Sequence, residues 1–420
     1  MTGARALKSA KLPTGGMPPT YETMHQIMIK FFFLGIILCF SAAKGFGWTN
    51  GELLIWISDN RAYHALVDLG KVFEKEVGAT VKVETQEQIN EKFQAAAQSG
   101  KGPDIFFWAH DRIGEWADAG LIKPLEIKDE FKSNFLPMSW DAVTHNKQIW
   151  GYPISLEAVS LIYNKKFVTG KPPGQLSEIP AFNRELKEKN PKVIAIMWDY
   201  NTPYFSWPFL ASAGAYSFKK TDNGYDLKDI GIDSPGALQG LQAIVDLMKE
   251  GVMPKGVTQS IMDQKMSGGE LAMMINGPWD WANLRKSGVD FALAAIPGVG
   301  GNPGRPYVGV QTALLNRSTP NTDLAVDFLE KYVCTVDGMK AMDADSPLGV
   351  PALKALCDEM CAKDPLIKTT YENCQNGDVM PNIPEMSKFW GSMKAAFEIA
   401  TDGRASPQVA LEDARKGLVK

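Results

Sequence analysis

The chain contains few of the residues on which metal binding and nucleophilic catalysis depend. Its 420 residues include four histidines and five cysteines. Three of the histidines, His64, His110 and His145, are scattered along the sequence and lack a serine or cysteine partner in a catalytic motif. The sequence therefore indicates neither a metal cluster nor a nucleophilic active site, and we expect no cofactor.

An excess of positive charge is also absent. The chain has 44 basic and 48 acidic residues, which gives a formal net charge of −4. Nucleic-acid binding requires basic side chains gathered on one face, so we expect no nucleic-acid partner. The hydrophobic content of 45% and the charged content of 22% are those of an ordinary globular protein. A chain of 420 residues is expected to contain more than one hydrophobic core.

No hydrophobic run is long enough to span a membrane. The apolar segment 31–43 falls short of the ~20 residues that a transmembrane helix needs. It follows Lys30 and ends in small residues, which is the layout of a secretory signal peptide. We therefore expect residues 1–43 to be a signal region that sends the protein to the periplasm. An uncleaved membrane anchor and a lipoprotein attached through Cys39 are the alternatives.

The other four cysteines lie in the last quarter of the chain, at Cys334, Cys357, Cys361 and Cys374. An even number of cysteines in an exported protein predicts two disulfides. Cys357 and Cys361 are one turn apart in an expected helix, 353–362, where a mutual bridge would be strained, so each is expected to pair with Cys334 or Cys374. A zinc site with four thiolates and a set of free thiols remain as alternatives.

Strands and helices alternate along the first hundred residues after the signal region. The pattern predicts strands at 53–57, 80–84 and 105–107, with helices at 63–77, 88–99 and 112–119. Such alternation is typical of an α/β fold with a mostly parallel sheet and helices on both faces. From about residue 160 the pattern repeats, with a strand at 193–197 and a helix at 237–249. Ligand loops are expected at the carboxyl ends of the strands.

An aromatic side chain and two charged side chains come together at the end of one expected strand. Trp108 ends the run that begins at Ile105, and Asp111 and Arg112 follow it. A sugar ring needs this combination, because its C–H faces pack on an aromatic ring and its hydroxyls bond charged groups. The alternative is a core tryptophan beside two solvated charges. Further aromatic residues follow Gly-Pro breaks or cluster at 204–207, 276–281 and 380–390.

These segments, together with 53–57 and 160–164, resemble the maltose-binding protein family of bacterial ATP-binding-cassette sugar uptake systems. The resemblance runs in the same order from about residue 50 to the C-terminus. It implies a two-lobed periplasmic binding protein fold with a ligand cleft between the lobes and a hinge of several crossings. The implied N-terminal lobe comprises 48–156 plus 312–360, and the C-terminal lobe comprises 157–311 plus 361–420. In the family, ligand binding closes the lobes, and the membrane permease recognises the closed form.

Carried over residue by residue, the resemblance implies a set of sugar contacts on both lobes. They are Trp108, Ala109, Asp111, Arg112, Glu157, Pro203, Tyr204, Phe205, Trp279, Met380 and Trp390. At one corner this chain departs from the family, because Asn60 stands where an acidic acceptor is common, Arg61 where lysine is common and Thr202 where glutamate is common. We expect Asn60 and Arg61 to bind the ligand as well. Amide and guanidinium groups bond hydroxyls differently from carboxylate and ammonium groups, so these positions affect which sugar fits.

The function implied by the resemblance is capture of an α-glucoside, maltose or a maltodextrin, by a monomer that delivers it to an ABC permease. Trehalose or another disaccharide is the alternative ligand, and a sugar sensor coupled to a chemoreceptor is an alternative role. A glycoside hydrolase with Asp111 and Glu157 as its paired carboxylates is a more distant alternative. Arg112 beside Asp111 favours an ionised hydrogen-bond acceptor over a catalytic acid, and the family that the chain resembles is not catalytic. We therefore expect no enzyme activity.

Overall fold

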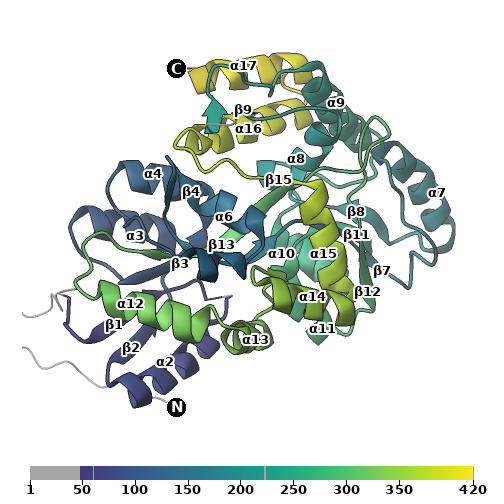
Figure 1. Cartoon of the computed structure of the whole chain (residues 1–420). Helices are drawn as coiled ribbons and strands as arrows, with labels where there is room; N and C mark the ends of the chain where they lie inside the picture. The colour runs from purple at the N-terminus through teal and green to yellow at the C-terminus, as the bar shows by residue number, and fades with distance from the viewer. Residues whose placement is uncertain (1–47, 60, 222–223, 420) are drawn as a thin grey trace, which may run out of the picture. The chain divides into compact units, whose positions relative to one another are not determined.

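The computed structural model describes residues 48–59, 61–221 and 224–419, which are shown in Figure 1. Residues 48–420 form one compact unit. The expected signal region 1–43 and Asn60 lie outside the described residues. Within the described ranges, no helix combines the length and the apolar character needed to cross a membrane.

The first sheet has six strands in the order β14-β6-β13-β3-β1-β2, and a seventh, β15, pairs with β13. Their bounds are β1 Glu52–Trp56, β2 Thr80–Glu84, β3 Ile105–Ala109, β6 Tyr152–Glu157, β13 Tyr307–Leu315, β14 Val350–Pro351 and β15 Asp378–Val379. The helices next to them along the chain are α2 Tyr63–Val77, α3 Ile89–Gln98, α4 Ile113–Asp118, α5 Asp129–Ser133, α6 Pro137–Val143, α12 Thr322–Phe328, α13 Val336–Asp345 and α14 Lys354–Lys363. A small hairpin joins β4, Thr144–His145, to β5, Gln148–Ile149.

The alternation predicted for the first hundred residues is confirmed. Helix α2 buries Leu66, Gly70 and Phe73, which recur on one face at helical spacing. Gly70 lets α2 approach β2 closely, because a Cβ at this position would come within 2.8 Å of the Val81 side chain. Strands β1, β2 and β3 run parallel, as expected.

The expectation that the whole sheet is mostly parallel is wrong. Strand β13 inserts antiparallel between β3 and β6, and β14 pairs antiparallel with β6. The direction of β13 is decided by where the chain returns to the sheet, and local periodicity carries no information about such a return. The sheet is therefore mixed, with the parallel order confined to β1–β3 and to the short pairing of β13 with β15.

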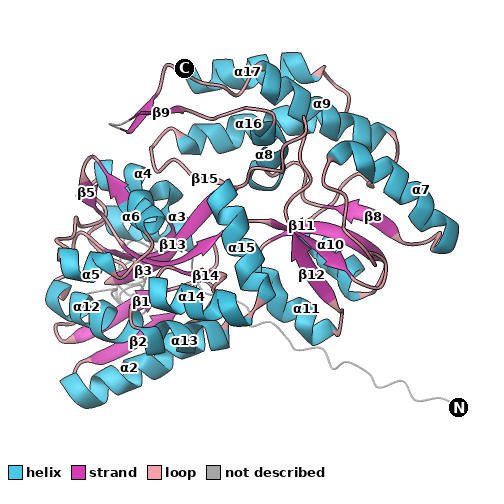
Figure 2. Ribbon diagram, turned by 45° about the vertical axis from the view of Figure 1, so that its right-hand side comes forward, coloured by secondary structure: helices cyan, strands magenta, loops and turns pink. Residues whose placement is uncertain are grey.

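A second sheet has the strand order β12-β7-β11-β8. Its strands are β7 Ser160–Asn164, β8 Ile194–Met197, β11 Leu271–Asn276 and β12 Phe291–Ala294. All six residues of β11 are buried, as is usual for a strand covered on both faces. The helices of this part are α7 Ile179–Lys189, α8 Pro203–Ser212, α9 Pro235–Lys249, α10 Gln259–Ser267, α11 Trp281–Ser287, α15 Pro365–Asn376, α16 Met386–Thr401 and α17 Pro407–Val419. Figure 2 shows the two groups of strands, each with its own helices, and the β9–β10 hairpin (Lys219–Thr221 and Gly224–Asp226).

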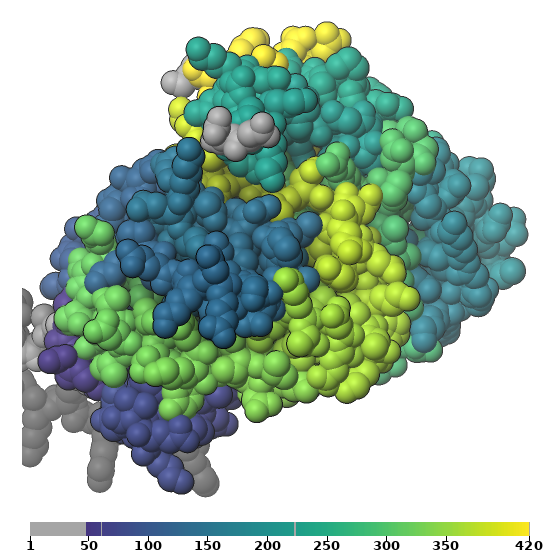
Figure 3. Space-filling view, viewed as in Figure 1, coloured from purple at the N-terminus to yellow at the C-terminus, as the bar shows by residue number. Residues whose placement is uncertain are grey.

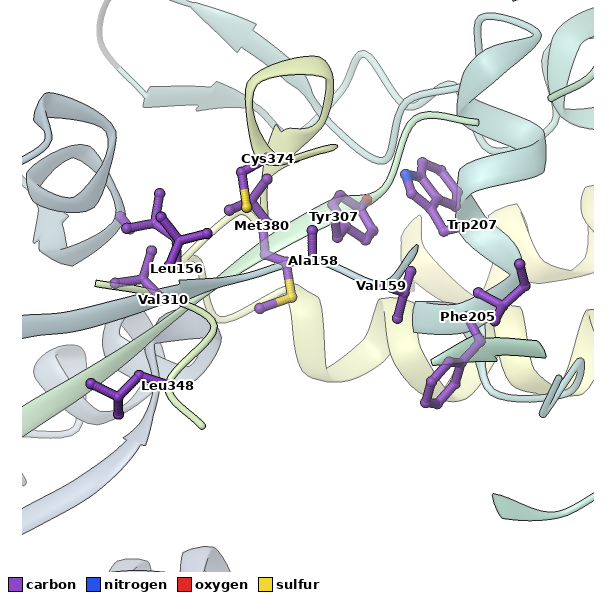
Figure 4. Close-up of a cluster of buried hydrophobic side chains, with 14 of the residues drawn as sticks. Leu156, Ala158, Val159, Phe205, Trp207, Tyr307, Val310, Leu348, Cys374 and Met380 are labelled. Atoms are coloured by element: carbon purple, nitrogen blue, oxygen red, sulfur yellow. The ribbon is translucent and has the colours of Figure 1, made fainter. Parts of the chain in front are cut away.

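The two sheets are joined by buried chain crossings. Strand β6 ends at Glu157 in the first sheet and β7 begins at Ser160 in the second, and the linking residues Ala158 and Val159 are fully buried. Figure 4 shows these two side chains within a cluster that contains Leu156 and Val310 of the first sheet together with Phe205 and Trp207 of α8. The expectation of separate cores is therefore corrected, because the buried apolar side chains form one continuous cluster from one sheet to the other.

Helix α15 forms a further connection between the sheets. It packs against β6 of the first sheet and against β7 and β12 of the second. Its Asn373 Nδ2 donates to Ser160 Oγ at 2.7 Å. In the space-filling view of Figure 3 the yellow-green segment that contains α14 and α15 lies beside the blue segment of the first sheet.

Candidate functional site

A cleft of about 660 Å³ is lined by residues from the ends of strands in both sheets. It gathers many of the residues that the sequence predicted as sugar contacts. These are Arg61, Trp108, Ala109, Asp111, Glu157, Pro203, Tyr204, Trp279, Met380 and Trp390. Because they come from strands, helices and loops more than 300 residues apart, their convergence is a property of the fold rather than of any one segment.

Two predicted residues contribute to the cleft only indirectly. Arg112 points its guanidinium at Glu115, with Nη2 2.8 Å from Oε1, and at Gln94 Oε1, 2.9 Å from Nη2. Phe205 is 8% exposed and packs behind the wall, with its ring centroid 6.3 Å from that of Trp279. Neither Arg112 nor Phe205 is among the described residues that line the cleft.

The cleft also contains residues that the sequence did not single out as contacts. They are Ser58, Gly309, Gln311, Gly391 and Lys394, and Thr202, which the sequence marked as a departure from the family, also lines the cleft. Lys394 lies four residues after Trp390 on α16, so helical spacing places the two side chains on the same face and would have predicted it. Gln311 lies in β13, and nothing in its local sequence indicates which face of which sheet it joins.

Charged and amide groups form the polar end of the cleft. The Arg61 guanidinium donates to both carboxylate oxygens of Glu157, with Nη2 3.2 Å from Oε2. Gln311 Nε2 also donates to Glu157 Oε2, at 3.2 Å, and the Tyr204 hydroxyl is 3.4 Å from the Glu157 carbonyl oxygen. Glu157 is 4% exposed, so its charge is held by this cation and this amide. Its free lone pairs remain available to a hydroxyl donor in the cleft.

The end of β3 supplies an apolar ring and a carboxylate. Trp108 is the fourth residue of β3 and is partly exposed to the cleft, and Asp111 follows in the short turn His110–Arg112. Removal from water raises the pKa of Asp111 to about 6, although a hydrogen bond from Trp390 and the charge of Arg112 oppose the shift. Asp111 and Trp390 therefore connect opposite walls of the cleft.

A buried histidine fixes the segments that carry these residues. Nδ1 of His110 accepts the Val310 N–H at 2.9 Å, and Nε2 lies 2.8 Å from the Met380 carbonyl oxygen. This arrangement needs the neutral ring with its proton on Nε2. Burial lowers the pKa of His110 to about 4, so the ring stays neutral at ordinary pH. His110 thereby holds β13 and Met380 against the turn that presents Asp111.

Aromatic rings make the opposite wall. Trp279 follows β11 and its ring centroid lies 6.2 Å from that of Tyr204, which stands in the first turn of α8. Trp390, in the first turns of α16, packs edge-on to Tyr307 with 5.8 Å between ring centroids. The cleft thus presents apolar ring surfaces on one side and charged hydrogen-bonding groups at one end.

The cysteines form no disulfide in the part of the chain that the structure describes. Cys334, Cys357 and Cys374 are buried free thiols, and Cys361 is a partly exposed one. Cys357 Sγ and Cys361 Sγ are 3.8 Å apart, and both lie on α14. Two disulfides were expected, and the structure instead matches the alternative of free thiols. Cys334 lies beside Glu330, whereas the other three cysteines lie on the packed helices α14 and α15. Figure 4 shows Cys374 next to Met380 and Leu156.

Among the described residues, no group of three or more histidine, cysteine, aspartate or glutamate side chains is placed to hold a metal ion. The cleft itself has one arginine, one lysine and two acidic residues, and its remaining lining is aromatic, apolar or neutral. Its chemistry is that of hydrogen bonding and ring stacking.

Comparison with known proteins agrees with this geometry. Residues 57–333 match the family model described as bacterial extracellular solute-binding protein. The chain belongs to this family. Bacterial extracellular solute-binding proteins of this family have a two-lobed periplasmic binding fold, and the two sheets with their buried crossings are that fold in this chain.

Individual relatives are similar over most of their length. A maltotriose-binding protein of Pyrococcus abyssi is 29% identical over 84% of this chain and 76% of the relative. A galactooligosaccharide-binding protein of Bacillus subtilis is 27% identical over 90% of this chain and 91% of the relative. The maltodextrin-binding protein MdxE of the same species is 29% identical over 92% and 94%, respectively. Solute-binding proteins with different named sugars are thus about equally similar to this chain.

Proposed function

We propose that this protein captures an α-linked glucose oligosaccharide, maltose or a maltodextrin, and delivers it to an ABC permease. The observation that carries the proposal is the cleft, in which Trp108, Trp279 and Trp390 surround a space whose polar end is built from Arg61 and Glu157. Glucose rings present C–H faces to indoles and equatorial hydroxyls to charged groups. Relatives named for maltotriose and maltodextrin support this ligand class.

The size of the cleft is that of a small-molecule site. Its volume of about 660 Å³ lies in the range of small-molecule sites, which is roughly 300–1,000 Å³. Stacking of each indole on a sugar face contributes on the order of 1–2 kcal/mol. Three such contacts and the charge-assisted bonds at the polar end support micromolar affinity, about −8 kcal/mol.

The lobes proposed are residues 48–156 plus 312–360 and residues 157–311 plus 361–420. The sheet membership of β1–β3 and β14 supports the first, and that of β7, β8, β11 and β12 supports the second. The lobes would close about the crossing at Ala158 and Val159, because ligand contacts on both walls favour the closed state. We propose that the protein acts in the periplasm as a monomer, after removal of its signal region.

Binding without turnover is part of the proposal. Glu157, one of the two carboxylates that a hydrolase would need, already accepts hydrogen bonds from Arg61 and Gln311. Asp111 is bonded to Trp390 on the opposite wall. A long incubation with maltotriose should release no glucose, and release of glucose would contradict the proposed role.

The test is calorimetric titration of the protein with maltose, maltotriose, trehalose, sucrose, glucose and a galactooligosaccharide. Micromolar binding of maltose or maltotriose, with weak or no binding of glucose, is the expected result. A Trp279→Ala variant should lose binding in the same titrations, whereas Trp48→Phe, a change far from the cleft-lining residues, should not. Binding of trehalose or the galactooligosaccharide alone would replace the α-glucoside assignment and keep the family role.

A further inference from the structure

A pair of acidic side chains lies directly behind the aromatic wall of the cleft. Asp280, the residue after Trp279, is 1% exposed, and Asp263 on α10 lies close enough to share an amide partner with it. Two carboxyl groups this close and removed from water favour a proton on one of them over two negative charges. Asn276 Nδ2 reaches both, at 3.3 Å from Asp280 Oδ2 and 3.5 Å from Asp263 Oδ1. The two acids and the amide therefore form one connected polar group under the β11 end.

The same group controls the backbone that carries the indole. Asn276 Oδ1 accepts the Gly277 N–H at 2.9 Å, and Pro278, Trp279 and Asp280 form the single 3-10 turn that follows. The Trp279 ring folds back over Gly277 so closely that a Cβ there would come within 2.2 Å of the ring. Trp279 and Asp280 are consecutive residues of this turn. A displacement of Asp280 would therefore also move the backbone of Trp279.

The cations on the neighbouring helices either pair with other acidic residues or are exposed. On α10, Lys265 pairs with Glu270 at 2.7 Å, and on α11, Arg285 pairs with Asp364 at 3.2 Å while Lys286 is exposed. Strand β11 contains no charged residue, and Asn283 Nδ2 contributes only an amide, 3.4 Å from Asp280 Oδ1. Among the described residues of these elements, the pair therefore has amides for neighbours and no cation to balance a second negative charge.

We propose that the proton shared by Asp263 and Asp280 positions Trp279 in the cleft, so that ligand capture weakens as this proton is lost. Both acids are positioning residues, since Trp279 and not they would touch the ligand. The part of this inference that concerns ligand capture rests on the proposed function, whereas the placement of Trp279 does not.

The direction of the pH dependence follows from the burial of the pair. Burial raises the pKa of Asp280 to about 7, helped by the charge of Asp263, and burial raises the pKa of Asp263 to about 6. The two groups titrate as a unit, and above about pH 7 both are ionised and repel each other. The turn that carries Trp279 then moves away from α10, and affinity falls as pH rises.

The experiment follows the Trp279 indole N–H by proton–nitrogen NMR between pH 5.5 and 8.5 without sugar, with Trp279→Phe used to assign the signal. The wild-type signal should shift with a midpoint between about pH 6 and 7, and it should be insensitive to pH in Asp280→Asn. Asp263→Asn removes the same repulsion from the other side and serves if Asp280→Asn does not fold. Asp413→Asn, on the exposed face of α17, is the matched control and should titrate like wild type.

Calorimetry with maltotriose over the same pH range completes the test. Wild-type affinity should fall about fivefold or more from pH 6 to pH 8.5, and Asp280→Asn should show a smaller fall. Asp111 is present in both proteins, so its own titration cancels in the comparison. An indole signal that moves identically in wild type and Asp280→Asn overturns the inference. If the indole responds as expected and no sugar binds at any pH, the placement of Trp279 stands and the proposed function fails.

Discussion

Arg61 and Glu157 form a two-pronged ion pair at the polar end of the cleft, with the guanidinium donating to both carboxylate oxygens. Their side chains are 21% and 5% exposed, so water screens the pair only partly. Arg61 precedes α2, whereas Glu157 is the last residue of β6 before the chain crosses to the second sheet. The pair therefore joins the ligand-binding loop of the first sheet to the crossing about which the lobes would move.

Glu157→Gln tests this relationship. The substitution keeps the size of the side chain but removes its charge, which leaves Arg61 without its anion and removes the strongest acceptor for a sugar hydroxyl. We expect maltotriose affinity to fall about 10–100-fold, measured by calorimetry. The matched control is Arg285→Lys, which alters an exposed ion pair with Asp364 and should leave the affinity unchanged. Unchanged affinity in Glu157→Gln would show that the carboxylate does not contact the ligand.

Removal of an indole should weaken binding without loss of the fold. Trp390 is partly exposed to the cleft, so Trp390→Ala removes a stacking surface and the hydrogen bond to Asp111. We expect about a 10-fold or larger rise in Kd, because one aromatic contact contributes roughly 1–2 kcal/mol. Trp390→Phe should recover part of the loss, since it keeps a ring but lacks the N–H donor. Equal losses in the two variants would mean that the hydrogen bond, rather than the ring face, is what matters.

His110 should make the folded state sensitive to acid. Its pKa is lowered by burial from 6.5 to about 4 in the folded protein, so the unfolded chain binds the extra proton more readily. This residue therefore contributes full stability above about pH 6.5, and the contribution declines as pH falls toward 4. The loss is about 3 kcal/mol over that interval. Urea unfolding of wild type and His110→Gln at pH 7.5 and 4.5 measures it, and the stability difference between the two proteins should shrink at the lower pH. A stability difference between wild type and His110→Gln that is the same at both pH values would contradict the buried neutral ring.

The four cysteines of the described residues should all titrate as thiols without a reductant. In the native protein, a thiol reagent should modify Cys361 first, since it alone of the four is partly exposed. Its rate should be modest because burial raises its pKa, which lowers the thiolate fraction. After denaturation, Cys334, Cys357 and Cys374 should react as well, and Cys361→Ser should remove the native signal. Recovery of thiols only after reduction would show that disulfides form in the protein.

How much of the structure the sequence predicted depends on the distance between interacting residues. The order β1-α2-β2-α3-β3 was predicted because each element has its own periodicity, and Trp108 and Asp111 lie in the cleft because they stand at, or just after, the carboxyl end of β3. The antiparallel position of β13 was not predicted, since its partners in β3 lie about 200 residues earlier. Local pattern contains nothing about a pairing over that separation.

In the candidate site, one difference from the prediction has a local cause and another has a long-range cause. Arg112 was expected to face the ligand, but Glu115 lies three residues later on the helix that follows and takes its guanidinium. This neighbour was visible in the sequence and would have corrected the expectation. Gln311 had no such signal, because its contact with Glu157 exists only once β13 has joined β6. Two disulfides were preferred over the alternative of free thiols because the sequence does not show how α14 and α15 pack, on which the separation of the cysteines depends.

The late arrival of β13 has a consequence for how the protein is made. His110 in the first sheet bonds Val310, 200 residues further along the chain, and β3 pairs with β13 in the same region. Until ribosomes have synthesised that strand, the edge of β3 has no partner and the first sheet cannot be completed. Closing loops of this length is slow compared with forming a helix. The first sheet of a nascent chain is therefore completed only late in its synthesis.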